Sequence, residues 1–182
     1  SLSIIDKLDT LVGFFLIDEK PTSSKDPFAL RRAAIGLLRT IIENNLTIRL
    51  RDLIDYLIKI YSDQGVKQLN NQASKDLILF FRERMKNILK EKNIRPDIIE
   101  ASISSHLSDN FLELYKKTLI MNKFISKEVG KNAISTYKRA SNILDQEKLN
   151  TKNGPDAVLF KQEEEKELFE RINSIRKSFT LK

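Results

Sequence analysis

Apolar residues three and four positions apart recur through most of this sequence, and that spacing constrains the fold more than any other feature. At 3.6 residues per turn it puts the apolar side chains on one face of an α-helix. Only five glycines and four prolines punctuate the 182 residues, and no stretch is convincing as a strand. The sequence therefore predicts an all-α fold, a helical bundle in two parts with no sheet.

The same spacing divides the chain into successive helices. The first is expected from about Leu2 to Phe15, and the second from Pro27 to about Glu43. The apolar face of the second is made by Leu30, Ala33, Ala34, Leu37, Leu38 and Ile41. A third helix, from about 49 to 61, should bury Leu50, Leu53, Ile54, Leu57 and Ile60. Later helices are expected up to about 92, at 96–103, from about 109 to a break near Ser126, from there to about 144, and at about 159–179.

Helix starts are predicted from residues that can satisfy free backbone N–H groups. Asp26 can accept hydrogen bonds from these groups, and Pro27 suits the first helical position because its missing N–H is not needed there. By the same reasoning Ser74 should cap the fourth helix, and Ser108 or Asp109 should open the sixth.

A polar stretch from Ser62 to Gln72 is typical of a linker. We place a domain boundary at its start. The chain is then expected to consist of an N-terminal part at residues 1–62 and a C-terminal part at residues 63–182.

Composition excludes several classes of protein. No apolar run approaches the roughly 18 residues that a membrane span needs, and the first residues lack the pattern of a secretory signal. The chain has no cysteine, which excludes disulfides, thiolate metal sites and cysteine nucleophiles. We therefore expect a cytoplasmic protein with no membrane association.

The formal net charge of +7 is unevenly distributed along the chain. One segment carries a run of cations against the single acid Glu128: Lys116, Lys117, Lys123, Lys127, Lys131, Lys138 and Arg139. The stretch after Asp156 is acidic instead. A lysine-rich helix is more often a solvated face than a binding site, but this segment is the part of the chain most able to face an anion.

No arrangement typical of catalysis is visible. The single histidine, His106, has no second histidine and no cysteine with which to share a metal. The glycines are isolated and match no nucleotide-binding fingerprint. Carboxylate pairs such as Asp6 with Asp9 lie one helical turn apart, a spacing at which side chains more often bond Lys or Arg than a cation. We predict no catalytic residue, no metal site and no cofactor in this chain.

Binding of RNA is the chemistry that remains. It needs cations for phosphates, planar groups for unstacked bases and amides for base edges. Tyr137, Lys138, Arg139 and Asn142 supply all of these within a short helical span, and Lys138 and Asn142 share a face because they are four apart. Two alternatives stay open: the segment is an ordinary solvated basic helix, or Tyr137 belongs to the core.

Other cations extend the RNA-binding candidates. Lys131 precedes Tyr137 on the same expected helix, and Arg84 and Lys86 lie beside the apolar face of the fourth helix. Arg31 and Arg32 are weaker candidates, because consecutive helical positions point about 100° apart and one of the two can simply bond a carboxylate.

Three segments resemble the β subunit of the heterotetrameric bacterial glycyl-tRNA synthetase in order and spacing. They are Asp6-Lys7-Leu8-Asp9-Thr10-Leu11-Val12-Gly13, then Lys25-Asp26-Pro27-Phe28-Ala29-Leu30-Arg31-Arg32-Ala33-Ala34 with Gly36, and Tyr137-Lys138-Arg139-Ala140-Ser141-Asn142-Ile143-Leu144. The first two are the more specific. Between Ser62 and Lys131 the resemblance rests mainly on the helix pattern.

The resemblance implies a division of labour. In that family the α subunit carries the aminoacylation site and uses ATP, and the β subunit supplies tRNA-binding domains. The first part would be the end of a histidine-aspartate phosphohydrolase-like domain, in which Asp6 would correspond to the last acidic metal ligand. The second would be part of a helical anticodon-binding domain, so tRNA-Gly and the α subunit are the expected partners.

The family pattern also implies that this chain is a piece cut from a longer one, shortened in its anticodon-binding part. Exposed apolar surface at both ends is then expected, and with it dimer contacts in a crystal. The alternative to tRNA binding is a protein-interaction module, in which the same helices dock the α subunit or other β-subunit domains.

Overall fold

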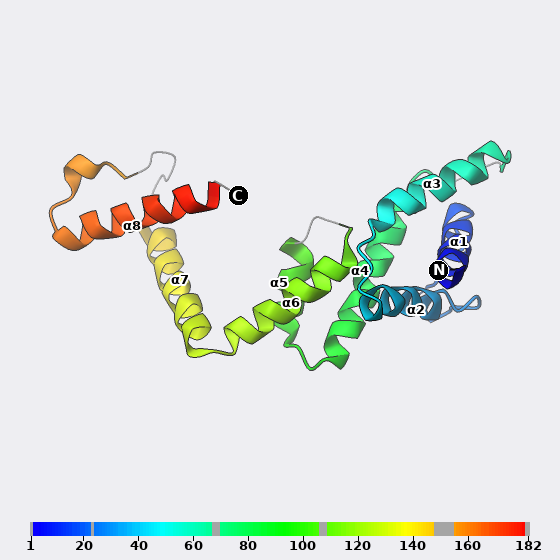
Figure 1. The fold of residues 1–182 in the computed structure, drawn as a ribbon, viewed down its shortest axis with the longest axis horizontal. Helices are drawn as coiled ribbons and strands as arrows, with labels where there is room; N and C mark the ends of the chain where they lie inside the picture. The colour runs from blue at the N-terminus through cyan, green and yellow to red at the C-terminus, as the bar shows by residue number, and fades with distance from the viewer. Residues whose placement is uncertain (1, 23, 67–69, 106–108, 148–154, 181–182) are drawn as a thin grey trace. The chain divides into compact units, whose positions relative to one another are not determined.

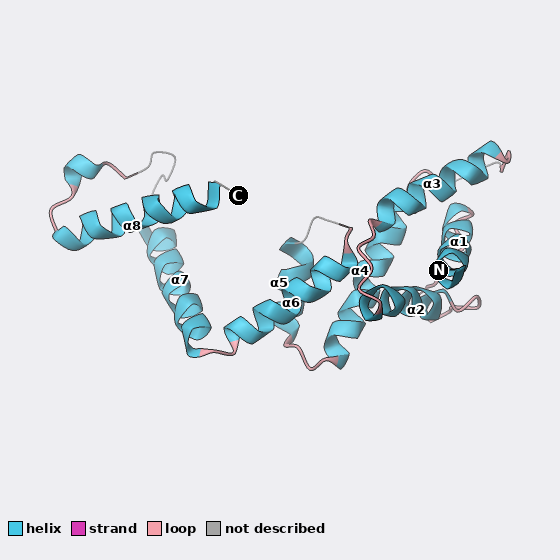
Figure 2. Ribbon diagram, viewed as in Figure 1, coloured by secondary structure: helices cyan, strands magenta, loops and turns pink. Residues whose placement is uncertain are grey.

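The computed structural model describes residues 2–22, 24–66, 70–105, 109–147 and 155–180. Over these ranges the chain is helical, with turns and loops between the helices and no strand (Figure 2). The prediction of an all-α fold is confirmed. None of the helices in the described part of the chain has the length and apolar character needed to cross a membrane.

Figure 1 shows the helices in their order along the chain. In chain order they are α1 (Leu2–Leu16), α2 (Leu30–Glu43), α3 (Leu50–Asp63), α4 (Ala73–Glu91), α5 (Pro96–Ser105), α6 (Phe111–Ile125), α7 (Glu128–Glu147), the 3-10 turn η1 (Ala157–Leu159) and α8 (Glu163–Thr180).

The chain forms two compact units, Ser1–Ile134 and Ser135–Lys182. The first holds α1 to α6 and the start of α7, and the second holds the rest of α7 with η1 and α8. The boundary expected between residues 62 and 63 rests on the polar stretch there. It lies inside the first unit, and it stays a prediction.

Helix α4 is the centre of the first unit, because α1, α2, α3, α5 and α6 all pack against it. Seven apolar residues on its inward face are almost completely buried: Ala73, Leu77, Ile78, Phe81, Met85, Ile88 and Leu89. Aromatic rings meet on both sides of it, with centroids 5.2 Å apart for Phe15 and Phe80 and 5.8 Å apart for Phe81 and Phe111. The apolar spacing in the sequence thus builds one continuous core.

The prediction that Leu53 of α3 belongs to the core is wrong. Leu53 is 38% exposed, whereas Leu50 and Ile54 are completely buried. On a helix Leu53 lies at one edge of the stripe formed by Leu50, Ile54 and Leu57. The core meets that stripe and its other edge, where Ile58 packs.

Asp26 caps α2, but from farther away than predicted. The helix begins at Leu30 and not at Pro27, and Ala29 precedes it in the left-handed region with φ 55°. The Asp26 carboxylate accepts hydrogen bonds from the backbone N–H groups of Leu30 (2.8 Å) and Arg31 (3.0 Å). A turn therefore separates the capping residue from the helix, and the stack of Phe28 on Phe14, with centroids 4.1 Å apart, accompanies that turn.

Two other predicted helix starts are wrong. Ser74 lies inside α4, which begins after Gln72, and its hydroxyl donates to Asp55 of α3 (2.6 Å). Asn110, not Asp109, caps α6 by accepting from the N–H of Glu113 (3.1 Å). Asp109 instead accepts from the N–H of Arg51 (2.8 Å), in the first turn of α3. Ser108 and His106 lie outside the described residues.

The last helix begins four residues later than expected, because two carboxylates cap successive turns. Asp156 accepts from the N–H of Val158 (3.0 Å) and starts η1. Glu165 then accepts from the N–H groups of Lys161 (2.8 Å) and Gln162 (3.0 Å), just before α8. The chain turns between these two caps instead of continuing as one helix.

The expected break near Ser126 is confirmed, since α6 ends at Ile125 and α7 begins at Glu128. Gly130 allows this corner to be tight. A Cβ atom at that position would lie 2.2 Å from the carbonyl oxygen of Phe124 and 2.8 Å from the Cα of Ile125, closer than any side chain can approach a backbone.

Gly130→Ala should therefore destabilise the chain by about 1 to 3 kcal/mol, because the backbone must shift to make room for the new methyl group. Gly36→Ala is the matched control. Its Cβ would meet only the mobile Lys7 side chain, at 3.4 Å, and alanine is about 0.5 to 1 kcal/mol better than glycine inside a helix. Urea denaturation should show opposite signs for the two variants.

Asp26→Ala should lower the free energy of unfolding by about 1 to 2 kcal/mol, the usual cost of losing a helix cap. Asp63→Ala, at the exposed C-terminal end of α3, should change it by less than about 0.5 kcal/mol. Equal losses in the two variants, measured by urea denaturation, would contradict the role assigned to the cap.

Candidate nucleic-acid interface

The segment that the sequence indicates most strongly lies on α7, in the second unit. Tyr137, Lys138, Arg139 and Asn142 are all exposed, and Tyr137 is 73% exposed. The alternative that Tyr137 belongs to the core is therefore wrong. Lys138 and Asn142 are four residues apart on a regular helix, so both stand on the same face, as expected.

The cations of this segment have few acidic neighbours. Lys138 and Arg139 make no ion pair with any residue in the described ranges. Lys131, near the start of the same helix and within the first unit, lies 3.8 Å from Glu128, a distance at the limit of an ion pair. Lys138 and Arg139 therefore keep their full charge available to a ligand.

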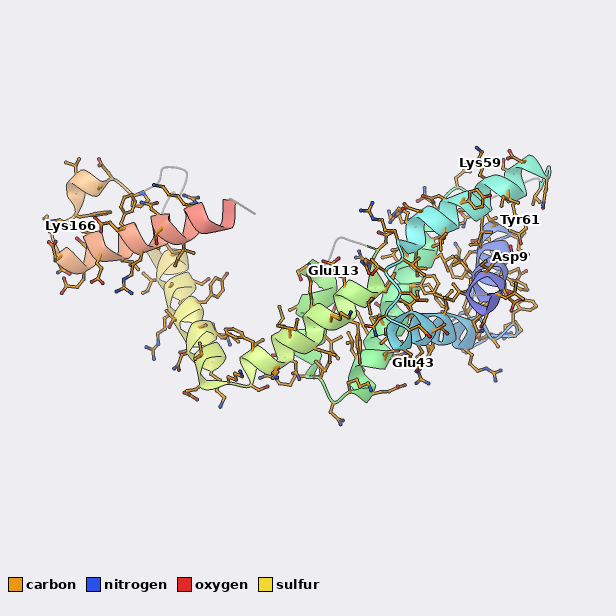
Figure 3. The ribbon with its side chains drawn as sticks, in the orientation of Figure 1. Asp9, Glu43, Lys59, Tyr61, Glu113 and Lys166 are labelled. Carbon is orange, nitrogen blue, oxygen red and sulfur yellow. The ribbon has the colours of Figure 1, made fainter. Side chains whose placement is uncertain are left out.

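A second group of exposed cations lies on α6 and in the turn that follows it, in the first unit. Lys117 is paired with Glu113 at 2.6 Å (Figure 3 labels Glu113). Lys116, Lys123 and Lys127 are exposed, and none of the three forms an ion pair with a described residue. Phe124 is 45% exposed beside them, so this face offers both phosphate-binding charge and an aromatic ring.

The α4 candidates have different surroundings. The Lys86 ammonium lies 3.0 Å from both Glu83 and Glu100, and hydrogen bonds to these two carboxylates raise its pKa. Arg84 has its guanidinium carbon 4.7 Å from the centroid of the Phe80 ring. Lys86 is therefore neutralised locally, while Arg84 is not.

Burial is the main reason why the pKa of Arg84 is lowered, and the nearby charge of Arg31 is the second. The guanidinium stays protonated at neutral pH, since an arginine does not lose its proton in a protein. Its partner ring was visible in the sequence only as a core residue. The four-residue spacing of Phe80 and Arg84 is the signal that could have revealed the stack.

Lys20 is a residue that the sequence analysis missed. It lies in the loop after α1, and its ammonium is 2.6 Å from Asp18 and 2.7 Å from Asp76 of α4. Hydrogen bonds to these carboxylates raise the pKa of Lys20, and the bond from Lys20 lowers the pKa of Asp76. Nothing in the local sequence points to this contact, because 56 residues separate Lys20 from Asp76.

The acidic residues of α1 have the following surroundings. Asp9 accepts a hydrogen bond from the hydroxyl of Tyr61 on α3 (3.0 Å; Figure 3), and Asp6, the position that the family resemblance relates to an acidic metal ligand, is exposed. Within the described ranges, no three His, Cys, Asp or Glu side chains come close enough together to hold a metal ion.

Known proteins share the sequence over most of its length. The profile of the glycyl-tRNA synthetase beta subunit family matches residues 1–104. The glycine–tRNA ligase beta subunit of Rickettsia felis is 40% identical over 180 residues, which cover 98% of this chain and 25% of that protein. That of Ruegeria sp. is 38% identical over 146 residues, covering 80% of this chain and 20% of that protein. The chain spans about a quarter of the length of the curated relatives it matches or less.

The Lys20–Asp76 pair should make stability depend on pH. Because the pKa of Asp76 is lowered by folding, its contribution is present above the unfolded pKa of about 3.9 and is lost as pH falls through the folded value. At pH 7 Asp76→Asn should be less stable than the native chain by up to about 1 kcal/mol. Urea denaturation should show this gap narrowing below about pH 4, and a constant gap would contradict the assignment.

Proposed function

The chain belongs to the glycyl-tRNA synthetase β subunit family, and from that premise we propose that it is a tRNA-binding portion of a glycine–tRNA ligase. Its role is to position tRNA-Gly, and it carries no catalytic residue of its own. The aminoacylation step and the ATP that drives it are assigned to the α subunit, in line with the family resemblance. The proposed partners are tRNA-Gly and that α subunit, and the proposed location is the cytoplasm.

The observation that carries this proposal is the exposed group on α7. The ring of Tyr137 is 73% exposed, and Lys138 and Arg139 beside it form no ion pair with a residue whose side chain the structure describes, so all three side chains are accessible to a ligand. The same group suits RNA. Lys138 and Arg139 would neutralise phosphates, Tyr137 would stack on an unpaired base, and Asn142 would bond a base edge.

The α6 face supports the proposal independently within the first unit. Lys116, Lys123 and Lys127 give it unneutralised positive charge, which attracts a polyanion without regard to sequence. Lys131, with its long ion pair, belongs with this group. Arg84 and Lys86 remain predicted contacts, and of the two Lys86 is the less favourable, because tRNA would have to compete with Glu83 and Glu100.

A protein-interaction module is the second candidate, and α8 is the observation that favours it. Leu168, Ile172 and Ile175 recur at four and three residues along this helix and are 60%, 51% and 55% exposed. A continuous apolar face of this kind is typical of protein contacts. Under this reading the helices of the second unit would dock the α subunit or another part of the β subunit.

Lys138→Ala combined with Arg139→Ala should weaken binding of tRNA-Gly to the full-length α/β enzyme by roughly tenfold at moderate salt. Each cation that contacts a phosphate contributes about 1 to the slope of log affinity against log salt, so the slope should fall by about 2. Filter binding or fluorescence anisotropy across a salt series measures both quantities.

Two variants sharpen this test. Lys161→Ala with Lys166→Ala also removes two cations from the second unit, and it should leave the slope almost unchanged, since Lys166 is paired with Glu163 at 3.1 Å. Asn142→Ala removes no charge, so it should reduce discrimination between tRNAs with little change in slope. Unchanged tRNA affinity together with weaker α/β assembly in the double variant would favour the interaction module instead.

A further inference from the structure

The guanidinium group of Arg84 forms no bond with an acidic side chain of the described residues. Its Nε atom is buried and has no hydrogen-bond acceptor among the described residues, and the group forms no ion pair with any of them. The ring of Phe80 covers one face of it. A buried donor without an acceptor is rare in folded proteins, because leaving it unpaired costs much of its desolvation energy.

The carboxylates around Arg84 are already engaged by other groups. Asp76 binds the ammonium of Lys20 at 2.7 Å, and Glu83 binds that of Lys86 at 3.0 Å. Asp26 accepts from the backbone at the start of α2. The neighbouring Arg31 adds like charge, which disfavours the protonated guanidinium. Among the described residues no carboxylate forms an ion pair with the Arg84 guanidinium, although the nearby charges of Glu83 and Asp26 favour its protonated form.

Arg84 opens into a shallow hollow on the surface of the first unit, which we call the α4 hollow. Its volume is about 270 Å³, slightly below the roughly 300 to 1,000 Å³ of small-molecule pockets. Its apolar lining comes from Phe15, Pro21, Leu79 and Phe80, and Leu79 is 50% exposed. The remaining lining residues are Lys20, Asp76, Glu83 and Arg84. The hollow thus combines an apolar floor with one unpaired cation.

This chemistry favours a protein side chain over an RNA strand. A phosphodiester backbone carries a charge on every nucleotide and would meet the carboxylates of Asp76 and Glu83 at the rim of the hollow. A single carboxylate can bond the Arg84 fork in the bidentate geometry that arginine prefers. An apolar neighbour of that carboxylate would then cover Leu79 and Phe80.

We propose that the α4 hollow is a docking site for a protein segment that presents a single Asp or Glu, in which that carboxylate binds Arg84 and an adjacent apolar side chain fills the space over Leu79 and Phe80. This role is distinct from tRNA binding by α6 and α7 and does not depend on it. In this proposal Arg84 contacts a protein, whereas the sequence predicted that it contacts RNA.

A carbodiimide cross-link tests the proposal in the full-length α/β enzyme. The reagent joins an amine to a carboxylate that touches it, so R84K should form an amide with an Asp or Glu of the docked segment, which mass spectrometry of the digest identifies. R39K is the matched control. Arg39 lies 2.7 Å from Glu91, so the amine introduced there should link to Glu91. Products of R84K confined to Asp76, Glu83 or Asp26, or no product while R39K reacts, would overturn the proposal.

Modification of the native side chain by phenylglyoxal provides a second measurement that needs no variant. In the assembled enzyme Arg84 should react at least tenfold more slowly than the exposed Arg32, both with and without tRNA-Gly. Rapid modification that slows only when tRNA-Gly is added would show that the group binds an RNA phosphate, and it would overturn the proposal. The tRNA affinity measured with the α7 variants is a separate readout, so the two proposals can fail independently.

Discussion

Burial of the apolar face of α4 is the constraint on which the first unit depends. Five helices pack against this one element, so each of them is placed by how its own apolar stripe meets residues such as Leu77, Phe81 and Met85. The same packing also fixes the positions of the charged residues of α4. Arg84 and Lys86 stand on a helix that is held on several sides, and their positions are therefore fixed by the core beneath them.

Much of this fold could be predicted from the sequence, because helix periodicity is a local property. The existence and order of the helices, the break near Ser126 and the buried faces of α2 and α4 all follow from spacing. The capping residues were the main source of error. Asp109 has the chemistry of a cap, but its N–H partner at Arg51 is 58 residues away, and no local pattern reveals which helix start a carboxylate will reach. The prediction that Leu53 is buried was wrong for a similar reason, because periodicity does not show how wide the buried stripe of a helix is.

The candidate interface, like the fold, could be predicted only in part from the sequence. The cations and the aromatic residue of α7 could be found from composition, and the structure then showed that Tyr137 is on the surface. What could not be predicted is which cations are already paired. Lys86 looked equivalent to Arg84 in the sequence, yet Glu83 and Glu100 engage Lys86, while Lys20 and the backbone of α2 engage the other carboxylates near Arg84. These pairings depend on contacts between helices that only the packed structure defines.

The bond between Asp109 and Arg51 also bears on the order in which the molecule can form during synthesis. The first turn of α3 leaves the ribosome without its cap, because the capping carboxylate is made 58 residues later. At about 5 to 20 residues per second, that delay is roughly 3 to 12 seconds. Over that interval the N-terminus of α3 stays incomplete, so the first unit cannot reach its full stability before the start of α6 has been translated.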